Sequence, residues 1–307
     1  MINLSKIINK SHELFESDLL KWESALSEII SDSSFLVLGG AGSIGQAICK
    51  EIFSRNPRKL HVIDISENNL VELVRDIRSS FGYIEGDFRT FALDIASLEY
   101  EAFVKYDGSY DYVLNLSALK HVRSEKDVFT LMRMIDVNII NTKKTLHQAI
   151  KRNSKKYFAV STDKASSPIN MMGASKRIME LILNNESSSI STSTARFGNV
   201  AFSDGSLLHS FIQRLNKGQP ITVPNDIRRY FMTPKEAAIL SLMSCFFGEN
   251  RETFFPKLTE TFLPISMIDI AVNFLESHGF EPHICDSEEF ARNNVEILKS
   301  KKNGLYF

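Results

Sequence analysis

The chain has 307 residues, of which 43% are apolar and 24% are charged, as in an ordinary folded globular protein. This composition excludes a disordered or fibrous chain, and the length allows one large domain or two modest ones. The 36 Lys and Arg residues nearly balance the 37 Asp and Glu residues. The resulting net charge of −1 gives no electrostatic reason to expect a nucleic acid or an anionic membrane as partner.

The patterns of cysteine, histidine and hydropathy narrow the possible classes of protein further. Cys49, Cys245 and Cys285 are scattered and form no Cys-x-x-Cys pair, which is typical of reduced cytoplasmic proteins. The seven histidines show no metal-binding spacing, so no metal site is expected. No apolar run approaches the length of a membrane span, and the first ten residues lack a signal-peptide core. We therefore expect a soluble, cytoplasmic protein.

Residues 1–30 form a separate amphipathic segment. Apolar residues such as Leu19, Trp22 and Leu26 recur at three-to-four spacing between charges, which predicts one or two helices. The sequence leaves open whether these helices pack on the main domain as a collar or form a dimer surface.

From residue 33 onward, short apolar runs alternate with longer amphipathic stretches. This alternation predicts an α/β fold with a doubly wound parallel sheet, covered by helices on both faces. The predicted strands are 35–38, 60–63, 88–93, 111–114, 157–160 and 193–196. The predicted helices are 43–55, 67–80, 128–152 and 171–185.

A glycine-rich turn directly follows the first predicted strand. Gly39, Gly42 and Gly45 have a spacing that permits a tight turn, a close approach of backbone N–H groups to a pyrophosphate, and close packing of helix on sheet. Ser43 and Ile44 begin the helix, whose positive end faces the phosphates in such a site. Because the turn lies between a strand and a helix, it predicts a dinucleotide-binding site.

An acidic residue at the end of the second strand indicates which dinucleotide binds. Asp64 lies 19 residues beyond Gly45, where a carboxylate accepts hydrogen bonds from the adenosine ribose and repels a 2′-phosphate. The next two residues are Ile65 and Ser66, and neither could bind that phosphate as Arg or Lys does. The sequence therefore favours NAD over NADP.

Two further strand ends complete the predicted cofactor site. Asp94 and Ile95 follow the third strand, where Asp94 either reaches the adenine edge or caps a helix that begins near Ser97. A run of mostly small residues follows the fourth strand and suits a backbone that passes close to a dinucleotide. These residues are Leu116, Ser117 and Ala118.

The fifth strand ends in three consecutive functional side chains, Thr162, Asp163 and Lys164. Ligands of an open parallel sheet bind beyond the carboxyl ends of its strands, so this row predicts a catalytic site, with an ordinary surface ion pair as the alternative. Eight residues beyond Lys164 a helix begins that carries Met172 and Lys176. These two lie one helical turn apart and can face the same cleft.

These motifs occur, together with three more, in the order found in a known family. The stretches are 39–45, 115–122, 161–165, 172–177, 196–200 and 229–233. In them the chain resembles the extended short-chain dehydrogenase/reductases of polysaccharide biosynthesis, and more narrowly the nucleotide-activated N-acetylglucosamine 4,6-dehydratases. The resemblance covers roughly residues 33–275.

The resemblance implies a reaction and roles for its residues. In such enzymes, NAD takes a hydride from C4 of the sugar and returns it to C6, after water is lost across C5 and C6. By similarity, Lys164 is the base at C5 and Asp163 the acid at C6, once burial and mutual charge shift their pKa values. Thr162 would bond near O4, and Lys176 would hold the nicotinamide ribose. The implied substrate is a UDP- or GDP-linked N-acetylhexosamine.

One position departs from the wider superfamily. Most members have a Tyr four residues before the Lys as the base for the sugar hydroxyl, whereas this chain has Met172, which cannot ionise. The combination of the row Thr162–Lys164 with Met172 and Lys176 resembles the dehydratase branch that retains the configuration at C5. A 4-epimerase or ketoreductase that lacks the Tyr is one alternative, and a non-catalytic dinucleotide-binding protein is another.

The resemblance also implies residues that bind the substrate. Asn199 and Arg229 match residues that contact the nucleotide diphosphate, and Arg229 can do so bidentately. Lys120, His121 and Glu125 follow the fourth strand, where the family borders cofactor and sugar. A histidine in a segment of this kind more often packs or forms a structural hydrogen bond than binds a ligand, so this alternative stays open for His121.

After residue 196 the alternation loosens and prolines become frequent. We therefore expect an NAD-binding domain at 31–196 and a smaller, loop-rich substrate-binding part at 197–307, some of which can rejoin the sheet. The apolar end at 304–307 resembles a strand, which leaves open that the natural chain continues. Family members commonly associate through helices around the fifth strand, so we expect a homo-oligomer that uses the helix at 128–152.

Overall fold

The computed structural model describes residues 4–10, 12–257, 262–295 and 303–306, and they form two compact units. The first unit comprises Met1–Leu14, Gly198–Glu236 and Lys257–Phe307, and the second comprises Phe15–Phe197 and Ala237–Pro256. This division differs from the three consecutive segments expected from the sequence. Both units are assembled from distant parts of the chain, and residues 1–30 are shared between them.

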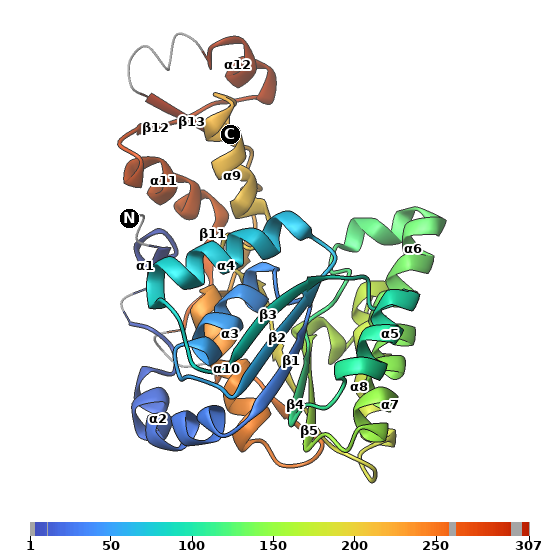
Figure 1. Ribbon diagram of the computed structural model, residues 1–307. Coiled ribbons are helices and arrows are strands. Elements are labelled where there is room, and N and C mark those ends of the chain that lie inside the picture. Colours follow the sequence, from blue (N-terminus) through green and yellow to red (C-terminus); the bar gives the residue numbers. More distant parts are fainter. Residues whose placement is uncertain (1–3, 11, 258–261, 296–302, 307) are drawn as a thin grey trace. The chain divides into compact units, whose positions relative to one another are not determined.

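The second unit contains a seven-stranded parallel sheet, in the order β10-β6-β5-β4-β1-β2-β3 (Figure 1). Its strands are β1 (Ser34–Leu38), β2 (Lys59–Asp64), β3 (Asp87–Ala92), β4 (Tyr112–Asn115), β5 (Lys156–Thr162), β6 (Ser191–Phe197) and β10 (Glu252–Phe254). The doubly wound parallel sheet predicted from the sequence is thus confirmed. The strand order reverses between β1 and β4, which is where such sheets bind ligands.

Helices cover both faces of this sheet (Figure 1). One face carries α3 (Ser43–Phe53), α4 (Glu67–Phe81) and α10 (Pro234–Phe247), and α2 (Glu16–Ser31) packs on α10. The other carries α5 (Leu98–Asp107), α7 (Asn141–Lys151) and α8 (Met171–Asn185). Neighbouring residues of β1 point to opposite faces, so Phe35 packs on Phe246 of α10 while Leu36 joins the core that includes Leu146 of α7. Both are apolar, as expected for a strand buried on both sides.

Three elements in and around the sheet were not predicted individually, namely α5, α10 and β10. α5 has a weak apolar pattern and buries only Tyr100 and Val104. Its N-cap is Ser97, which accepts a hydrogen bond from the Tyr100 N–H at 3.2 Å, so of the two alternatives left open for Asp94 the helix cap is wrong. β10 pairs in parallel with β6 and returns to the sheet from the C-terminal half of the chain.

The helix predicted at 128–152 is interrupted by a π-helical turn. α6 covers Val128–Ile135, the turn η2 covers Asp136–Ile140, and α7 follows. The turn contains the buried Asn138, whose Oδ1 accepts from the Leu119 N–H at 2.9 Å and whose Nδ2 donates to the Leu119 carbonyl at 3.0 Å. A π-turn of this kind commonly marks a functional region.

The first unit consists of short elements around a separate apolar core. They are α1 (Leu4–Ile7), β7 (Asn199–Val200), α9 (Leu207–Asn216), β8 (Arg228–Arg229), β9 (Phe231–Met232), β11 (Ile265–Ser266), α11 (Met267–Ser277), β12 (Glu281–Ile284), α12 (Glu288–Asn293) and β13 (Asn303–Tyr306). Phe211 of α9 packs on Phe274 of α11 with ring centroids 5.7 Å apart, and Ile7 joins them. The expected strand at the C-terminal end is β13, which pairs with β12, whereas residue 307 lies outside the described residues.

A buried ion pair ties the N-terminal segment into this first unit. Lys10 Nζ lies 2.5 Å from Glu236 Oε2, and neither side chain is more than 7% exposed. Glu236 Oε1 also accepts from the Leu14 N–H at 2.6 Å. Within the described ranges, no helix has both the length and the apolar character needed to cross a membrane.

Candidate active site

The glycine-rich turn between β1 and α3 is shaped by close backbone contacts. Gly39 has φ of 73°, a left-handed conformation that glycine adopts without steric cost. A Cβ on Gly39 would lie 2.7 Å from the Ser117 backbone nitrogen, and one on Gly45 would lie 2.5 Å from the Gly39 carbonyl oxygen. Gly42 is the N-cap of α3 and supplies no side-chain cap, which leaves this helix start suited to an anion. Ser43 and Ile44 form its first turn.

Asp64 ends β2, and its carboxylate is held by the glycine-rich turn. Oδ2 accepts from the Ala41 N–H at 3.0 Å, and Oδ1 accepts from the Ser66 N–H at 2.9 Å. These bonds fix the orientation of the carboxylate, and a carboxylate retains further acceptor capacity for ribose hydroxyls. The geometry therefore fits the cofactor role predicted for Asp64.

Asp94 follows β3 and forms an ion pair that was not predicted. Oδ1 accepts from the Ala96 N–H at 2.9 Å, and Oδ2 accepts from Arg133 of α6 at 2.8 Å. The neighbouring Ile95 is buried in the core. Contact of either residue with an adenine stays a prediction.

The segment after β4 is fixed by a buried amide. The Asn115 side chain donates to Thr142 Oγ1 at 3.1 Å and to the Tyr157 hydroxyl at 2.9 Å, and it accepts from the Ser117 N–H at 3.1 Å. This network holds the chain beside Gly39. The residues of the segment are Leu116, Ser117 and Ala118.

Thr162, Asp163 and Lys164 lie together at the carboxyl end of β5. Asp163 Oδ1 accepts from the Thr162 hydroxyl at 2.8 Å, from the Lys164 N–H at 2.8 Å and from Lys164 Nζ at 3.0 Å. The Asp163 and Lys164 side chains are 56% and 41% exposed. The expected burial of this pair is therefore wrong, because both residues belong to the short turn η3 (Asp163–Ala165), in which only Ala165 is buried.

Helix α8 brings the second predicted motif beside this turn. Met172 and Lys176 are both buried, and Lys176 Nζ donates to the Val160 carbonyl of β5 at 2.9 Å. Burial lowers the pKa of Lys176 to about 8, although the Glu180 carboxylate acts in the opposite direction. A Cβ on Gly173 would lie 2.7 Å from the Lys164 carbonyl oxygen, so α8 begins in direct contact with the catalytic candidate.

The three candidates after β4 are placed differently from one another. Lys120 and His121 are exposed, and His121 precedes the 3₁₀ turn η1 (Val122–Lys126). Glu125 Oε2 accepts from the Met171 N–H at 2.8 Å and so caps α8. This capping contact gives Glu125 a structural role that the sequence did not suggest.

Asn199 and Arg229 belong to the first unit. Asn199 Nδ2 donates to the Tyr230 carbonyl at 3.2 Å, and β7, which contains Asn199, pairs with β9. Arg229 is exposed in β8, as is Arg228. Their contact with a nucleotide diphosphate stays a prediction.

Two buried polar residues of the second unit were missed in the sequence. Asn138 also donates to Ser175 of α8 at 3.0 Å, and Glu180 accepts from Ser161 at 2.6 Å. Both carry a recognisable signal, because each interrupts the apolar face of a predicted helix. Glu180 lies one turn beyond Lys176 on the same face.

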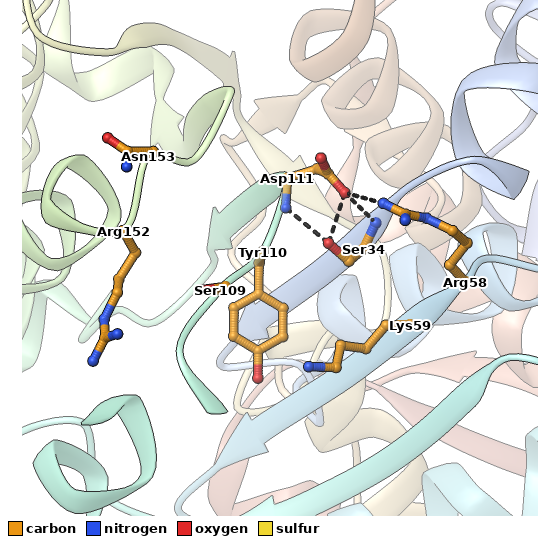
Figure 2. Close-up of a pocket in the computed structure, with 8 residues that line it drawn as sticks. All are labelled: Ser34, Arg58, Lys59, Ser109, Tyr110, Asp111, Arg152 and Asn153. Carbon is orange, nitrogen blue, oxygen red and sulfur yellow. Dashed lines mark hydrogen bonds and ion pairs between the residues drawn. The ribbon is translucent and has the colours of Figure 1, made fainter. Parts of the chain in front are cut away.

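A pocket of about 420 Å³ opens at the opposite end of the sheet (Figure 2). Ser34 begins β1 and Lys59 begins β2, so this pocket lies at the amino ends of the strands. It is lined by Ser34, Arg58, Lys59, Ser109, Tyr110, Asp111, Arg152 and Asn153. Ligands of such sheets bind at the carboxyl ends, so we do not assign the active site to this pocket. Among the described residues, no group of three His, Cys, Asp or Glu side chains could hold a metal ion.

A family model described as polysaccharide biosynthesis protein matches residues 35–297. The chain belongs to this family. An uncharacterized membrane protein of Methanocaldococcus jannaschii is 30% identical to it, over 84% of this chain and 76% of its own length. The capsular polysaccharide biosynthesis protein CapD of Staphylococcus aureus is 30% identical over 90% of this chain. The match spans only 46% of CapD.

Solved structures show the same fold. The structure of Pen from Bacillus thuringiensis is similar with a TM-score of 0.72 and 25% identity, over 91% of this chain and 78% of that one. WbmF of Bordetella bronchiseptica, solved with NAD+ and UDP, is similar with a TM-score of 0.66 and 18% identity, over 83% and 81% of the two chains. DesIV of Streptomyces venezuelae, a dTDP-glucose 4,6-dehydratase, is similar with a TM-score of 0.65 and 18% identity, over 80% and 81%. The fold of the family is thus that of the extended short-chain dehydrogenase/reductases.

Proposed function

We propose that this protein is an NAD-dependent nucleotide-sugar 4,6-dehydratase, a lyase that converts a UDP- or GDP-linked N-acetylhexosamine to its 4-keto-6-deoxy product. One observation carries the proposal. A carboxylate bonded to both a hydroxyl and an ammonium stands at the carboxyl end of β5, in Thr162, Asp163 and Lys164. At the start of α8, beside this group, lies Met172, which cannot ionise. The dehydratase activity of DesIV supports the choice.

The second unit fits NAD as the cofactor. The Gly39 conformation and the tight approach at Gly45 form the backbone turn that a pyrophosphate requires. Asp64 has a fixed carboxylate for the adenosine ribose, and Lys176 supplies an ammonium for the nicotinamide ribose. When bound, NAD would supply hydride chemistry at C4 and C6 of the sugar.

The Asp163–Lys164 pair has the chemistry that elimination of water needs. A ketone at C4 acidifies the C5 hydrogen, so a base must act at C5 and an acid at the C6 hydroxyl. In this proposal the reactive form of the pair is a neutral Lys164 amine and a neutral Asp163 carboxyl, which together carry the same single proton as the ion pair at 3.0 Å. Lys164 takes the C5 proton as Asp163 protonates the departing hydroxyl, which restores the ion pair. In this proposal the C4 hydroxyl proton passes to water, and C5 regains a proton from water when C6 is reduced. Thr162 orients the Asp163 carboxylate and faces O4 in this proposal.

The proposal is tested with purified protein, NAD and candidate nucleotide sugars, by following the products with NMR. We expect a 4-keto-6-deoxy sugar from UDP-N-acetylglucosamine or a GDP-linked analogue. Lys164→Ala should lower the rate of its formation about 10²–10⁴-fold, because it removes the base. Lys105→Ala, at an exposed lysine in the last turn of α5, is the matched control and should act as wild type. If no candidate nucleotide sugar gives a 4-keto product while NAD is bound, the proposal is contradicted.

A 4-epimerase is the second candidate, and the comparisons favour it equally. The UDP-glucose 4-epimerase of Rickettsia prowazekii is 28% identical over 80% of this chain and 70% of its own length. Met172 leaves no ionisable group at that position for the C4 hydroxyl in either reaction, so the preference for the dehydratase rests on the Asp163–Lys164 pair, which elimination needs and epimerisation does not. Reaction in ²H₂O separates the two: elimination introduces deuterium at C5, whereas epimerisation at C4 does not.

The proposed oligomer rests on the exposed face of α6. Val128, Phe129 and Met132 are 59%, 77% and 62% exposed, which is unusual for large apolar side chains of one helix. We propose that α6 and α7 form the contact between subunits. Gel filtration of the wild type and of Phe129→Glu tests this. If the wild type elutes as a dimer and Phe129→Glu elutes at the same volume, the proposed contact is contradicted.

A further inference from the structure

The second unit buries an acidic residue that the proposed reaction does not use. Glu180 of α8 is 3% exposed. Its Oε1 accepts from Ser161 at 2.6 Å and from Arg196 Nε at 2.7 Å, and its Oε2 accepts from a second Arg196 nitrogen at 2.5 Å. Arg177, whose side chain is partly exposed, also donates to Glu180 Oε2 at 3.2 Å. A charged carboxylate is rarely buried so completely unless its partners compensate for the lost hydration.

These bonds join three elements directly beneath the candidate active site. Ser161 is in β5 and Arg196 in β6, where the two residues are partners in register. Ser161 also immediately precedes Thr162, the first residue of the catalytic row. Glu180 therefore anchors the end of β5 to α8, the helix that carries Lys176.

Lys176 is the nearest buried ammonium on the same helix. It is 5% exposed, and its Nζ donates to the Val160 carbonyl at 2.9 Å and lies 3.6 Å from Met179 Sδ. Val160 of β5 and Met179 of α8 contact it, and Glu180, which Arg196 of β6 holds, lies one helical turn further along the buried face of α8. Burial acts to lower the pKa of Lys176, and Glu180 is the negative charge that opposes this effect. Burial acts to raise the pKa of Glu180 itself, but the bonds from Arg196 and Ser161 outweigh it, so Glu180 stays ionised.

We propose that Glu180 is a positioning residue of the cofactor site: its carboxylate, clamped by Arg196 and Ser161, is the counter-charge that keeps the Lys176 ammonium protonated beside the end of β5. This inference rests on the proposed NAD site. Without the carboxylate, the burial that disfavours the protonated form of Lys176 would be unopposed. A neutral amine would lose both its charge and one of the hydrogen-bond donors needed to hold a ribose.

The test is the pH dependence of NAD binding by Glu180→Gln, measured by calorimetry between pH 6 and pH 9. In the wild type we expect affinity to fall as Lys176 deprotonates near pH 8. In Glu180→Gln the fall should begin about one pH unit lower, so that affinity is about fivefold weaker than wild type near pH 8, close to tenfold weaker at pH 9, and nearly equal at pH 6. A merely structural role would weaken binding equally at every pH.

Two further variants keep the inference falsifiable if Glu180→Gln folds poorly. Lys176→Arg carries a group that does not titrate in this range, so its NAD affinity should no longer fall between pH 7 and pH 9. Glu51→Gln removes a carboxylate from another Glu–Arg pair, at the end of α3 away from the glycine-rich turn, and should leave the pH profile unchanged. A folded Glu180→Gln with the wild-type profile, or an undiminished fall in Lys176→Arg, would overturn the inference. Absence of NAD binding by the wild type at every pH would instead refute the proposed function, and the inference with it.

Discussion

Gly45 is a position where a single added carbon atom would collide with the backbone. A Cβ there would lie 2.5 Å from the Gly39 carbonyl oxygen and 2.6 Å from the Gly40 Cα, and backbone atoms cannot rotate away. At Gly42, three residues earlier in the same turn, the nearest atom would be 3.8 Å away. The two glycines share a motif but serve different purposes: Gly45 permits packing of α3 on the turn, and Gly42 leaves the surface open for a ligand.

We expect Gly45→Ala to lower the free energy of unfolding of the NAD-free protein by about 2–3 kcal/mol, because the turn must shift to admit the methyl group. Gly42→Ala should cost less than about 1 kcal/mol but weaken NAD binding, because its methyl group lies where the pyrophosphate approaches. Urea unfolding followed by circular dichroism, with calorimetry for NAD, measures both. Equal losses of stability in the two variants would contradict this assignment.

At the scale of elements, α8 carries much of the candidate site, and its start is secured twice. The Asn170 side chain accepts from the Gly173 N–H at 2.9 Å, and Glu125 accepts from the Met171 N–H at 2.8 Å. Orphan N–H groups at a helix start need such partners. The helix then places Met172 and Lys176 on its buried face.

Asn170→Ala should therefore lower the free energy of unfolding by about 1 kcal/mol, the usual value of an N-cap. Asn184→Ala is the matched control, because Asn184 is exposed in the last turn of the same helix, where alanine is tolerated. Chemical unfolding of both variants measures the difference. If Asn184→Ala lowers the free energy of unfolding as much as Asn170→Ala does, the N-cap makes no specific contribution to stability.

At the scale of the whole second unit, Asp111, which precedes β4, binds residues at the amino ends of β1, β2 and β5. Figure 2 shows its contacts with Ser34 and Arg58. It accepts from the Ser34 N–H at 2.9 Å and the Ser34 hydroxyl at 2.7 Å, from Arg58 at 2.9 Å, and from Lys155 at 3.0 Å. Burial acts to raise the pKa of Asp111, but the bonds from Ser34 and Lys155 outweigh it and lower the pKa to about 2. The ionised carboxylate therefore stabilises the folded state.

Because the pKa of Asp111 falls from an ordinary value of 3.8 to about 2 on folding, its contribution is complete above pH 4 and is lost as the pH falls toward 2. We expect Asp111→Asn to cost about 1–2 kcal/mol at pH 7, after allowance for partial exposure of its cationic partners, and progressively less below pH 4. Urea unfolding of variant and wild type from pH 7 to pH 2.5 tests this. A difference that does not shrink with acid would contradict the pKa assignment.

Local patterns in the sequence predicted six of the seven sheet strands, and they placed the glycine-rich turn and the row Thr162–Lys164 directly after strands, as the structure has them. The reason is that each depends on neighbours in the chain: alternation of apolar runs defines the strands, and glycine spacing defines the turn. The weakly patterned α5 was missed, because its packing depends mainly on Tyr100 and Val104. The π-turn was missed as well, because it depends on where Asn138 meets Leu119, 19 residues away.

By itself, then, the sequence determined the doubly wound parallel fold, the family and the row Thr162–Lys164 at a strand end, since strand–helix alternation and short motifs are local properties. Only the tertiary structure decided that this row is exposed, that Lys176 is buried, and that Glu180 is clamped between two strands. Burial and long-range hydrogen bonds depend on which distant segments meet, and so they set the charge states on which the proposed chemistry depends.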